Sequence, residues 1–353
     1  MTRWPLWIAR AACVLAVLAA GAGLARADDA LIGRDCLKDP RGNELQLFIE
    51  NDSFGATDQY YTNGLKLGLG VRGECLYNLF KKPSDELLKT VRELGGSDIG
   101  KASNFGLFIG QNLYTPRDIS IAAPQPFDRP WAAWAYIGTV AQVVTDQRLH
   151  TVEVDLGVVG PPALGKQVQT FWHEQVVDAP TPRGWGNQIR AEPGILITYV
   201  HKRRYGDADG LQLIPHAGFS TGTIMTHVRA GGLLRYGRRM TGFGPDGIEP
   251  GGAMLKNTRA DDGAGGDREW FVFGGVDARL IGHNIFLDGS LFRDGPGVQR
   301  RDAVHDLIAG ISMRFDRLRF SVTRIRRSEE FRTPVSTGGK QRFYSINVGY
   351  EFR

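Results

Sequence analysis

The chain has 353 residues, of which 42% are hydrophobic and 23% are charged, so it is long enough for one large folded domain and too apolar for a disordered chain. Its 46 glycines follow no three-residue period, which excludes a collagen-like fibre and favours many turns and closely approaching strands. The whole chain carries a formal charge of +5.

Residues 1–27 have the pattern of a secretory signal peptide. Arg3 and Arg10 accompany an apolar stretch that falls short of the ~20 residues a membrane-spanning helix needs, and Ala25-Arg26-Ala27 fits a cleavage site. Without the three arginines of this segment, 40 basic side chains face 38 acidic ones, a formal charge of +2. We therefore expect an exported domain spanning residues 28–353, with no nucleic-acid partner.

Two cysteines, Cys36 and Cys75, remain after the signal peptide. An exported protein can form disulfides, so these two side chains are either a bonded pair or two free thiols. If the chain forms an outer-membrane β-barrel and its mature N-terminus is in the periplasm, the first strand runs outward and the second returns. Both cysteines then fall at the periplasmic end, so this topology permits their pairing.

Alternation of apolar and polar residues is the main structural signal from Leu45 to the C-terminus. Near the start, Leu45, Leu47 and Ile49 alternate with Gln46, Phe48 and Glu50. The pattern gives about twelve strands, and the segment 285–291 fits a strand less clearly. The other expected strands include residues 65–71, 105–112, 133–144, 152–158, 195–200, 211–221, 228–236, 271–280, 307–315, 318–323 and 344–352.

Two all-β architectures are compatible with this alternation: a soluble sandwich, and a transmembrane antiparallel barrel whose apolar face meets lipid. Glu153, Asp155 and Glu351 are expected in mid-strand, where a wet barrel interior tolerates charge. The chain also closes on a strand with alternate aromatic residues. These features favour an outer-membrane barrel of about 12 strands.

The connections between the expected strands differ greatly in length. Asp316 joins two strands almost directly, whereas residues 160–191, 241–269 and 328–340 form long connections. Outer-membrane barrels have short periplasmic turns and longer external loops. We therefore expect the long connections on the external side.

The densest group of polar residues flanks the first external loop. Glu50-Asn51-Asp52 ends one strand, and Asp58 and Thr62-Asn63-Gly64 precede or begin the next. Carboxylate and amide oxygens suit Ca²⁺, which takes 6 to 8 oxygen ligands. The same residue types are also ordinary loop formers, so this pattern alone does not establish a metal site.

A short helix is expected in the external loop that follows Gly160. Gln169 and His173 are four residues apart and share one helix face, so Gln169 is placed to orient the imidazole. The chain has no Gly-x-Ser-x-Gly, His-Glu-x-x-His or phosphate-loop motif. A histidine base and a cation would nevertheless suffice for ester hydrolysis.

Several motifs together resemble the outer-membrane lipid A 3′-O-deacylases. The resemblance runs through the mature chain as far as Ser328-Glu329-Glu330-Phe331. The motifs that carry it are Glu50-Asn51-Asp52-x-Phe54, Thr57-Asp58-x-Tyr60-Tyr61-Thr62-Asn63-Gly64, Tyr114-Thr115-Pro116, Gly160-Pro161, Val168-Gln169-x-x-x-His173 and Trp185-x-Asn187-Gln188.

The resemblance implies a twelve-stranded barrel that hydrolyses the 3′-linked acyloxyacyl ester of lipid A with the help of Ca²⁺. It implies His173 as general base, Asp52 as a metal ligand, and three positioning residues, Asn51, Thr62 and Gln169. Arg117 is at the place where a family member has a Lys-Arg pair, and this suggests a contact with a lipid A phosphate. The chain ends in Arg353 instead of the usual aromatic residue.

Two other functions remain open at this point. A passive outer-membrane channel would share the barrel, and an exported soluble ligand-binding protein would share the strand pattern. The favoured hypothesis is a monomeric hydrolase in the bacterial outer membrane, in contact with membrane lipids and with lipopolysaccharide as its substrate.

Overall fold

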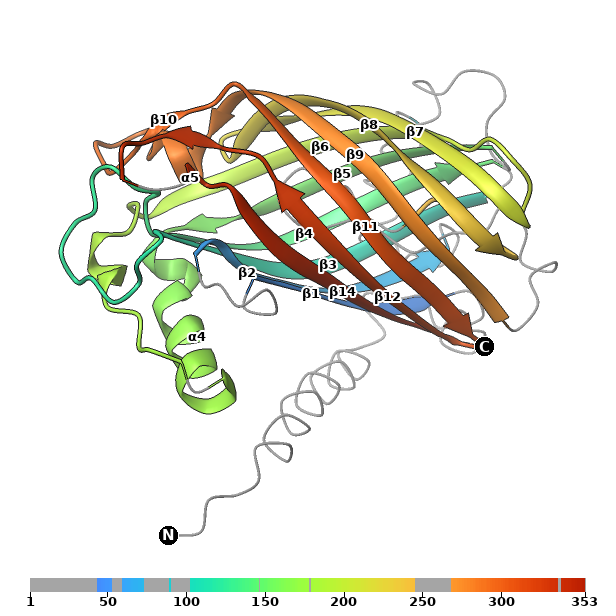
Figure 1. The fold of residues 1–353 in the computed structure, drawn as a ribbon, viewed down its shortest axis with the longest axis horizontal. Coiled ribbons are helices and arrows are strands. Elements are labelled where there is room, and N and C mark those ends of the chain that lie inside the picture. The colour runs from blue at the N-terminus through green and yellow to red at the C-terminus, as the bar shows by residue number, and fades with distance from the viewer. Residues whose placement is uncertain are drawn as a thin grey trace, which may run out of the picture.

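The computed structural model describes residues 43–52, 59–72, 89, 102–145, 147–177, 179–244, 268–335 and 338–352. The described strands form a closed antiparallel barrel of twelve strands (Figure 1). This confirms the fold class that the alternation predicted. The predicted signal peptide and both Cys36 and Cys75 lie outside the described residues.

Neighbouring strands in the barrel follow chain order, and β14 pairs with β1 to close it. A separate small sheet pairs β10 (Gln299–Arg300) with β13 (Phe331–Arg332). The barrel strands are β1 (Glu44–Asn51), β2 (Tyr60–Arg72), β3 (Ala102–Thr115), β4 (Ala132–Val144), β5 (Arg148–Val159), β6 (Glu192–Arg203), β7 (Gly210–Gly222), β8 (Met225–Arg238), β9 (Arg268–Asn284), β11 (Ala303–Phe315), β12 (Leu318–Arg327) and β14 (Gln341–Glu351).

The apolar face of the strands points outward, and the polar face points into the barrel. On β5, Leu156 is 52% exposed, whereas Glu153 and Asp155 on the opposite face are buried. Lys66 of β2 reaches across the interior and forms an ion pair with Glu153 at 3.1 Å. An outward apolar face is what a barrel wall in contact with lipid requires.

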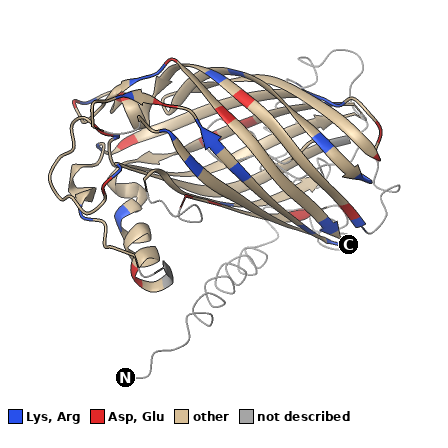
Figure 2. Ribbon diagram, viewed as in Figure 1, with Lys and Arg blue, Asp and Glu red and all other residues tan. Residues whose placement is uncertain are grey.

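Basic and acidic residues occur along several strands of the barrel (Figure 2), and ion pairs link some of their side chains in the interior. Asp306 of β11 binds Arg279 at 2.6 Å and Arg327 at 2.7 Å, and Asp277 of β9 binds Arg229 at 2.7 Å. Buried charges are costly unless an opposite charge accompanies them, so this pairing explains how the interior accommodates them.

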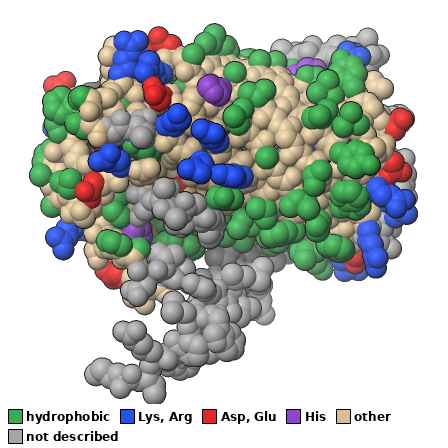
Figure 3. Space-filling view, viewed as in Figure 1, with side chains coloured by type: hydrophobic (Ala, Val, Ile, Leu, Met, Phe, Trp, Pro, Cys, Tyr) green, Lys and Arg blue, Asp and Glu red, His purple; other side chains and the backbone are tan. Residues whose placement is uncertain are grey.

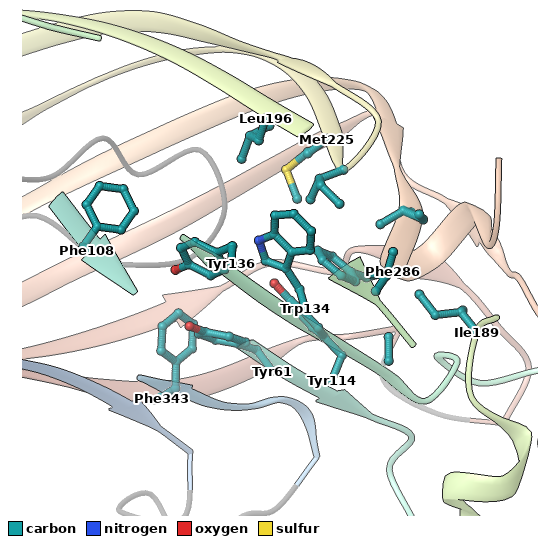
Figure 4. Close-up of a cluster of buried hydrophobic side chains, with 14 of the residues drawn as sticks. Tyr61, Phe108, Tyr114, Trp134, Tyr136, Ile189, Leu196, Met225, Phe286 and Phe343 are labelled. Carbon is teal, nitrogen blue, oxygen red and sulfur yellow. The ribbon is translucent and has the colours of Figure 1, made fainter. Parts of the chain in front are cut away.

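An aromatic cluster occupies the interior near one end of the barrel (Figure 4). Tyr114 stacks on Phe286 with ring centroids 4.1 Å apart, and Tyr61 meets Phe343 edge to face at 5.1 Å. Such pairs stabilise beyond their buried area, by about 0.5 to 1.5 kcal/mol each. The cluster also includes Trp134, Tyr136, Ile189, Leu196, Met225 and Ile285.

The two rims of the barrel carry different connections between strands. One rim, called here the site rim, carries the connections after β1, β3, β5, β7, β9 and β12; the other, the terminal rim, carries the remaining connections and the end of β14. The connection between β8 and β9 leaves and re-enters the barrel at the terminal rim, where β8 ends at Arg238 and β9 begins at Arg268, although residues 245–267 lie outside the described residues. The expectation that all the long connections share the external side is therefore wrong for this one, while residues 160–191 and 328–340 are on the site rim.

The segment 285–291 does not form a strand. Ile285–Asp288 is a short helix, α5, whose first turn is capped by Asn284, with Oδ1 accepting the Phe286 N–H at 3.0 Å. Ile285 and Phe286 are buried in the aromatic cluster. Its apolar side chains thus pack inside the barrel mouth and do not continue a lipid-facing strand.

Among the described residues, no helix has the length and apolar character that crossing a membrane as a helix requires.

Candidate active site on the outer face of the site rim

Asn51 and Asp52 are at the site-rim end of β1. Asn51 shares the outward side of the strand with Leu45, Leu47 and Ile49, and it pairs with Asn63 of β2. Asp52 is fully buried, and its Oδ2 accepts the backbone N–H of Gln59 at 2.7 Å. The hydrogen bond joins the two strand ends and fixes the carboxylate beside Asn51.

A β-bulge at the start of β2 sets the direction of Thr62. Tyr61 pairs with Tyr114 and Asn63 pairs with Leu113, so Thr62 is the extra residue. A bulge changes which side chains face outward. Tyr61 turns into the barrel, where its hydroxyl donates to Glu50 at 2.8 Å. Thr62 turns the other way, and its Oγ1 lies 2.8 Å from that of Thr115.

The loop between β5 and β6 covers the outer face of β3 and β4 beside these residues. It contains η3 (Pro161–Ala163), α4 (Gly165–Trp172), η4 (His173–Val177) and η5 (Gly184–Asn187). Figure 1 shows α4 outside the barrel, next to the site rim. The predicted helix in this loop is thus confirmed.

Apolar packing holds the loop against the barrel wall. Leu113 and Ala133 are on the outward faces of β3 and β4, in line with the exposed Ile109 and Ile137, yet both are buried because Ala163 and Trp185 cover them. Gly165 allows this approach, since a Cβ there would be 2.5 Å from the Trp185 ring and 2.6 Å from Ala133. The side chain of Gln111 adds a hydrogen bond to the Ala163 carbonyl at 2.6 Å.

His173 is at the point where α4 ends and the chain widens into the π-helical turn η4. Turns of this kind are frequent at functional sites. The side chain is 3% exposed, and Nδ1 lies 2.6 Å from the Pro180 carbonyl oxygen. A carbonyl oxygen can only accept, so Nδ1 carries the hydrogen. In the neutral imidazole, Nε2 therefore holds the lone pair and can act as a base.

Gln169 is one turn before His173 and is also buried. Its Oε1 accepts the indole N–H of Trp185 at 2.8 Å, which joins α4 to η5. The expectation that Gln169 orients the imidazole stays a prediction, because the partner seen at Nδ1 is the Pro180 carbonyl.

Arg117 follows β3 on the same rim, with an exposed side chain. Its backbone N–H donates to Asp128 Oδ2 at 3.1 Å, which fixes the main chain and leaves the side chain directed to the surface. The adjacent Asp118 carboxyl has a pKa below its usual value because the Ser120 hydroxyl and backbone N–H both donate to it. The negative charge of Asp118 is therefore next in the chain to the positive charge of Arg117.

The donor atoms at Asp52 and Asn51 are oxygens, the ligand type that a hard cation such as Ca²⁺ prefers. A fully buried carboxylate next to an amide oxygen offers the oxygen ligands that Ca²⁺ takes. Within the described segments, no three His, Cys, Asp or Glu side chains lie grouped as a metal centre. Among the described residues, Asn51 is the side chain next to Asp52 that could share in holding Ca²⁺, and Asp58, which the sequence places in the same polar group, lies outside the described residues.

Three residues that position the site were not identified from the sequence. Thr115 is the hydrogen-bonding partner of Thr62, Trp185 that of Gln169, and Pro180 that of His173. Thr115 and Trp185 lie in motifs already noted, so their presence there was a usable signal. Pro180 acts through its carbonyl group, which any residue carries, and had no signal in the sequence.

The fold and these positions define the class of the molecule. It is an outer-membrane β-barrel in which Asn51, Asp52 and Thr62 lie at one rim, and a helical loop that carries His173 packs on the outer face of the strands next to them, β3 and β4. Among known protein families, the model of the outer membrane protein LpxR matches residues 10–352. The chain belongs to this family, which confirms the resemblance that the motifs carried.

One solved structure supports the barrel fold. LpxR from Salmonella typhimurium has 20% sequence identity and a TM-score of 0.65, with 88% of this chain and 100% of that chain covered. The β domain of the Bordetella autotransporter BrkA is 11% identical with a TM-score of 0.43, covering 88% of this chain and 98% of that one. No protein with a curated description matches the chain.

Proposed function

We propose that this protein is a lipid A 3′-O-deacylase that removes the 3′-linked acyloxyacyl chain with His173 as general base. The observation that carries the proposal is the state of His173: it is buried, and its Nδ1–H donates to the Pro180 carbonyl, so that Nε2 carries the lone pair of the neutral ring. The membership of the LpxR family supports the substrate class through the resemblance of its motifs to the lipid A deacylases.

The chemistry follows from these groups. His173 Nε2 takes a proton from water, and the water oxygen attacks the ester carbonyl carbon. The carbonyl oxygen gains negative charge, and the intermediate then expels the sugar oxygen, which receives the proton back from the imidazolium. The products are the free acyloxyacyl acid and a lipid A that carries a 3′ hydroxyl group.

Asn51, Thr62 and Asp52 would act on the substrate and on the charge that develops. The Asn51 amide and the Thr62 hydroxyl are on the outer face of neighbouring strands, where they can orient an ester that approaches from the lipid side. Asp52, with Asn51, would hold Ca²⁺. When bound, the ion supplies positive charge that stabilises the oxyanion.

The location of the site on the outside of the barrel supports a membrane lipid as the substrate. The residues face the same side as the lipid-facing apolar wall, and Leu164 and Phe171 of the covering loop are each 52% exposed. The passive channel is less well supported because aromatic side chains and ion pairs occupy the described part of the interior. The barrel wall and the family match argue against a soluble binding protein.

Expression in a host with lipid A, followed by mass spectrometry of the lipid A, tests the proposal. The wild-type chain should release the 3′-linked acyl group, and His173→Ala and Asp52→Ala should lose this activity while the folded barrel persists. His305→Ala, a change at an exposed histidine on the same rim, is the matched control. Unchanged product yield from His173→Ala would refute the assignment.

The role of the metal needs a separate measurement. EDTA should stop the reaction of the purified protein, and added Ca²⁺ should restore it. Full activity in the chelator would exclude a catalytic role for Ca²⁺. The role of His173 would then still be decided by the activity of His173→Ala.

A further inference from the structure

Three arginines project from the outer wall next to the proposed active site. Arg324 and Arg326 are exposed on β12, and Arg342 is exposed on β14. Figure 3 shows basic side chains gathered on this face, between the apolar wall and the site rim. We call Arg324, Arg326 and Arg342 the outer arginine cluster.

The strand pattern fixes the direction of these side chains. Leu318 and Phe320 of β12 are 47% and 41% exposed, and Arg324 and Arg326 continue the same face toward the site rim. An arginine in the middle of a lipid-facing wall destabilises a barrel by about 2 to 4 kcal/mol, but near the interface the cost falls to about 0 to 1 kcal/mol. The cluster thus belongs at the level of the lipid headgroups.

The arginines repel one another in the bare protein. Arg326 and Arg342 are direct cross-strand partners, and like charges in that arrangement are destabilising. Among the residues that the structure describes, none of the three forms a salt bridge. The next residue along the chain gives the contrast: Arg327 faces inward and binds Asp306 at 2.7 Å. The outward arginines therefore need an anion from outside the chain.

We infer that the outer arginine cluster binds a phosphate group of a lipid in the outer leaflet. Guanidinium groups bind phosphate oxygens with paired, charge-assisted hydrogen bonds, and a phosphate between Arg326 and Arg342 would replace their repulsion with attraction. Basic residues close to a membrane surface attract anionic headgroups. The inference depends on the outer-membrane location and on these charges, and it holds whether or not the proposed hydrolysis occurs.

The cluster is close to the proposed active site without being part of it. Asn51 of β1 pairs with Tyr344 of β14, which pairs with Arg324 of β12. Neighbouring strands are about 4.8 Å apart, so the backbones of Asn51 and Arg324 are separated by roughly 10 Å. A phosphorylated lipid bound here would lie next to Asn51 on the same outer face of the barrel.

Native mass spectrometry of the detergent-solubilised protein tests the inference. The His173→Ala chain is titrated with bisphosphorylated lipid A and with dephosphorylated lipid A, so that turnover does not change the ligand. It should prefer the phosphorylated form, and the added changes Arg324→Gln, Arg326→Gln and Arg342→Gln should weaken its binding by about tenfold or more. Binding of the dephosphorylated form should not change.

The control removes three other arginines. Arg238→Gln, Arg268→Gln and Arg317→Gln delete the same charge from exposed positions at the terminal rim, and binding should stay at the starting level. Inorganic phosphate should compete only weakly.

Equal binding by the cluster variant and the starting chain would overturn the inference. Full competition by inorganic phosphate at low concentration would overturn the assignment to a lipid. If the triple variant does not fold, Arg342→Gln alone, which removes one member of the facing pair, should still weaken binding, and no effect there would overturn the inference equally.

Discussion

Two histidines illustrate how the interior of the barrel differs from the outer face of its site rim. His216 in the interior has Nε2 at 2.7 Å from the Asp277 carboxylate, which also binds Arg229. His173 on the outer face has Nδ1 on a backbone carbonyl. The interior imidazole is part of a network of paired charges, which suits a structural role. The outer imidazole is oriented by a neutral group that fixes its tautomer, which suits a base.

The largest expected effect separates these two histidines by activity. His173→Gln should lower deacylation by about 10²- to 10⁴-fold, the range that a general base contributes. His216→Gln should keep most of the activity, because its partners are within the interior network. Time courses of lipid A deacylation, corrected for folded protein, measure both. Equal losses from the two variants would remove the functional distinction between the regions.

The next effect concerns stability in the interior. Asp306→Asn removes the nearest carboxylate of both Arg279 and Arg327 and leaves each with one acidic neighbour at 3.6 Å, and breaking a buried pair costs about 3 to 5 kcal/mol. Asp302→Asn is the control, since that side chain is 85% exposed and its pair with Arg300 contributes at most about 1 kcal/mol. Unfolding by urea in detergent, followed by tryptophan fluorescence, gives the difference. Similar midpoints for both would show that the interior pairing is not stabilising.

A smaller effect tests how the covering loop is held. Gly165→Ala puts a Cβ against Trp185 and Ala133, and such overpacking costs about 1 to 3 kcal/mol. It should also displace His173 and lower activity, by up to about 10²-fold. Gly186→Ala, at a position with no atom within 4 Å of the added Cβ, should change neither. Normal activity in Gly165→Ala would mean that the position of α4 does not control the site.

The smallest effect is expected at the bulge. Thr62→Val removes the hydroxyl that meets Thr115, a hydrogen bond that contributes about 1 kcal/mol, so activity should fall about fivefold. Thr62→Ser keeps the hydroxyl and should restore most of the rate. A rate for Thr62→Val equal to that of the wild type would leave Thr62 without a positioning role.

Strand periodicity predicted the fold well because every strand of the barrel wall follows one rule: apolar residues that face outward alternate with polar residues that face the interior. Glu153 and Asp155 were expected in the interior from their alternation with apolar residues, and they lie there. The rule fails at Ile285, where apolar side chains enter the aromatic cluster and form α5. Periodicity records that a residue is apolar, and it does not distinguish lipid from a packed interior as the partner.

The candidate site was less predictable than the wall. The motifs led to His173 and Asp52, and counting the strands brought both to one rim. The direction of Thr62 depends on a single extra residue in β2, which no alternation reveals. The hydrogen bond from His173 to the Pro180 carbonyl depends on how the loop turns after α4, and backbone groups leave no trace in the sequence.

The outward direction of Asn51 and Thr62 also determines how a ligand arrives. A molecule that stays embedded in its leaflet reaches this face by two-dimensional diffusion, without dissolving in water or threading a pore. Encounter frequency would then follow the mole fraction of that molecule among its neighbours. Diluting it with inert detergent at constant bulk concentration should slow the encounter, as expected of a catalyst that works at an interface.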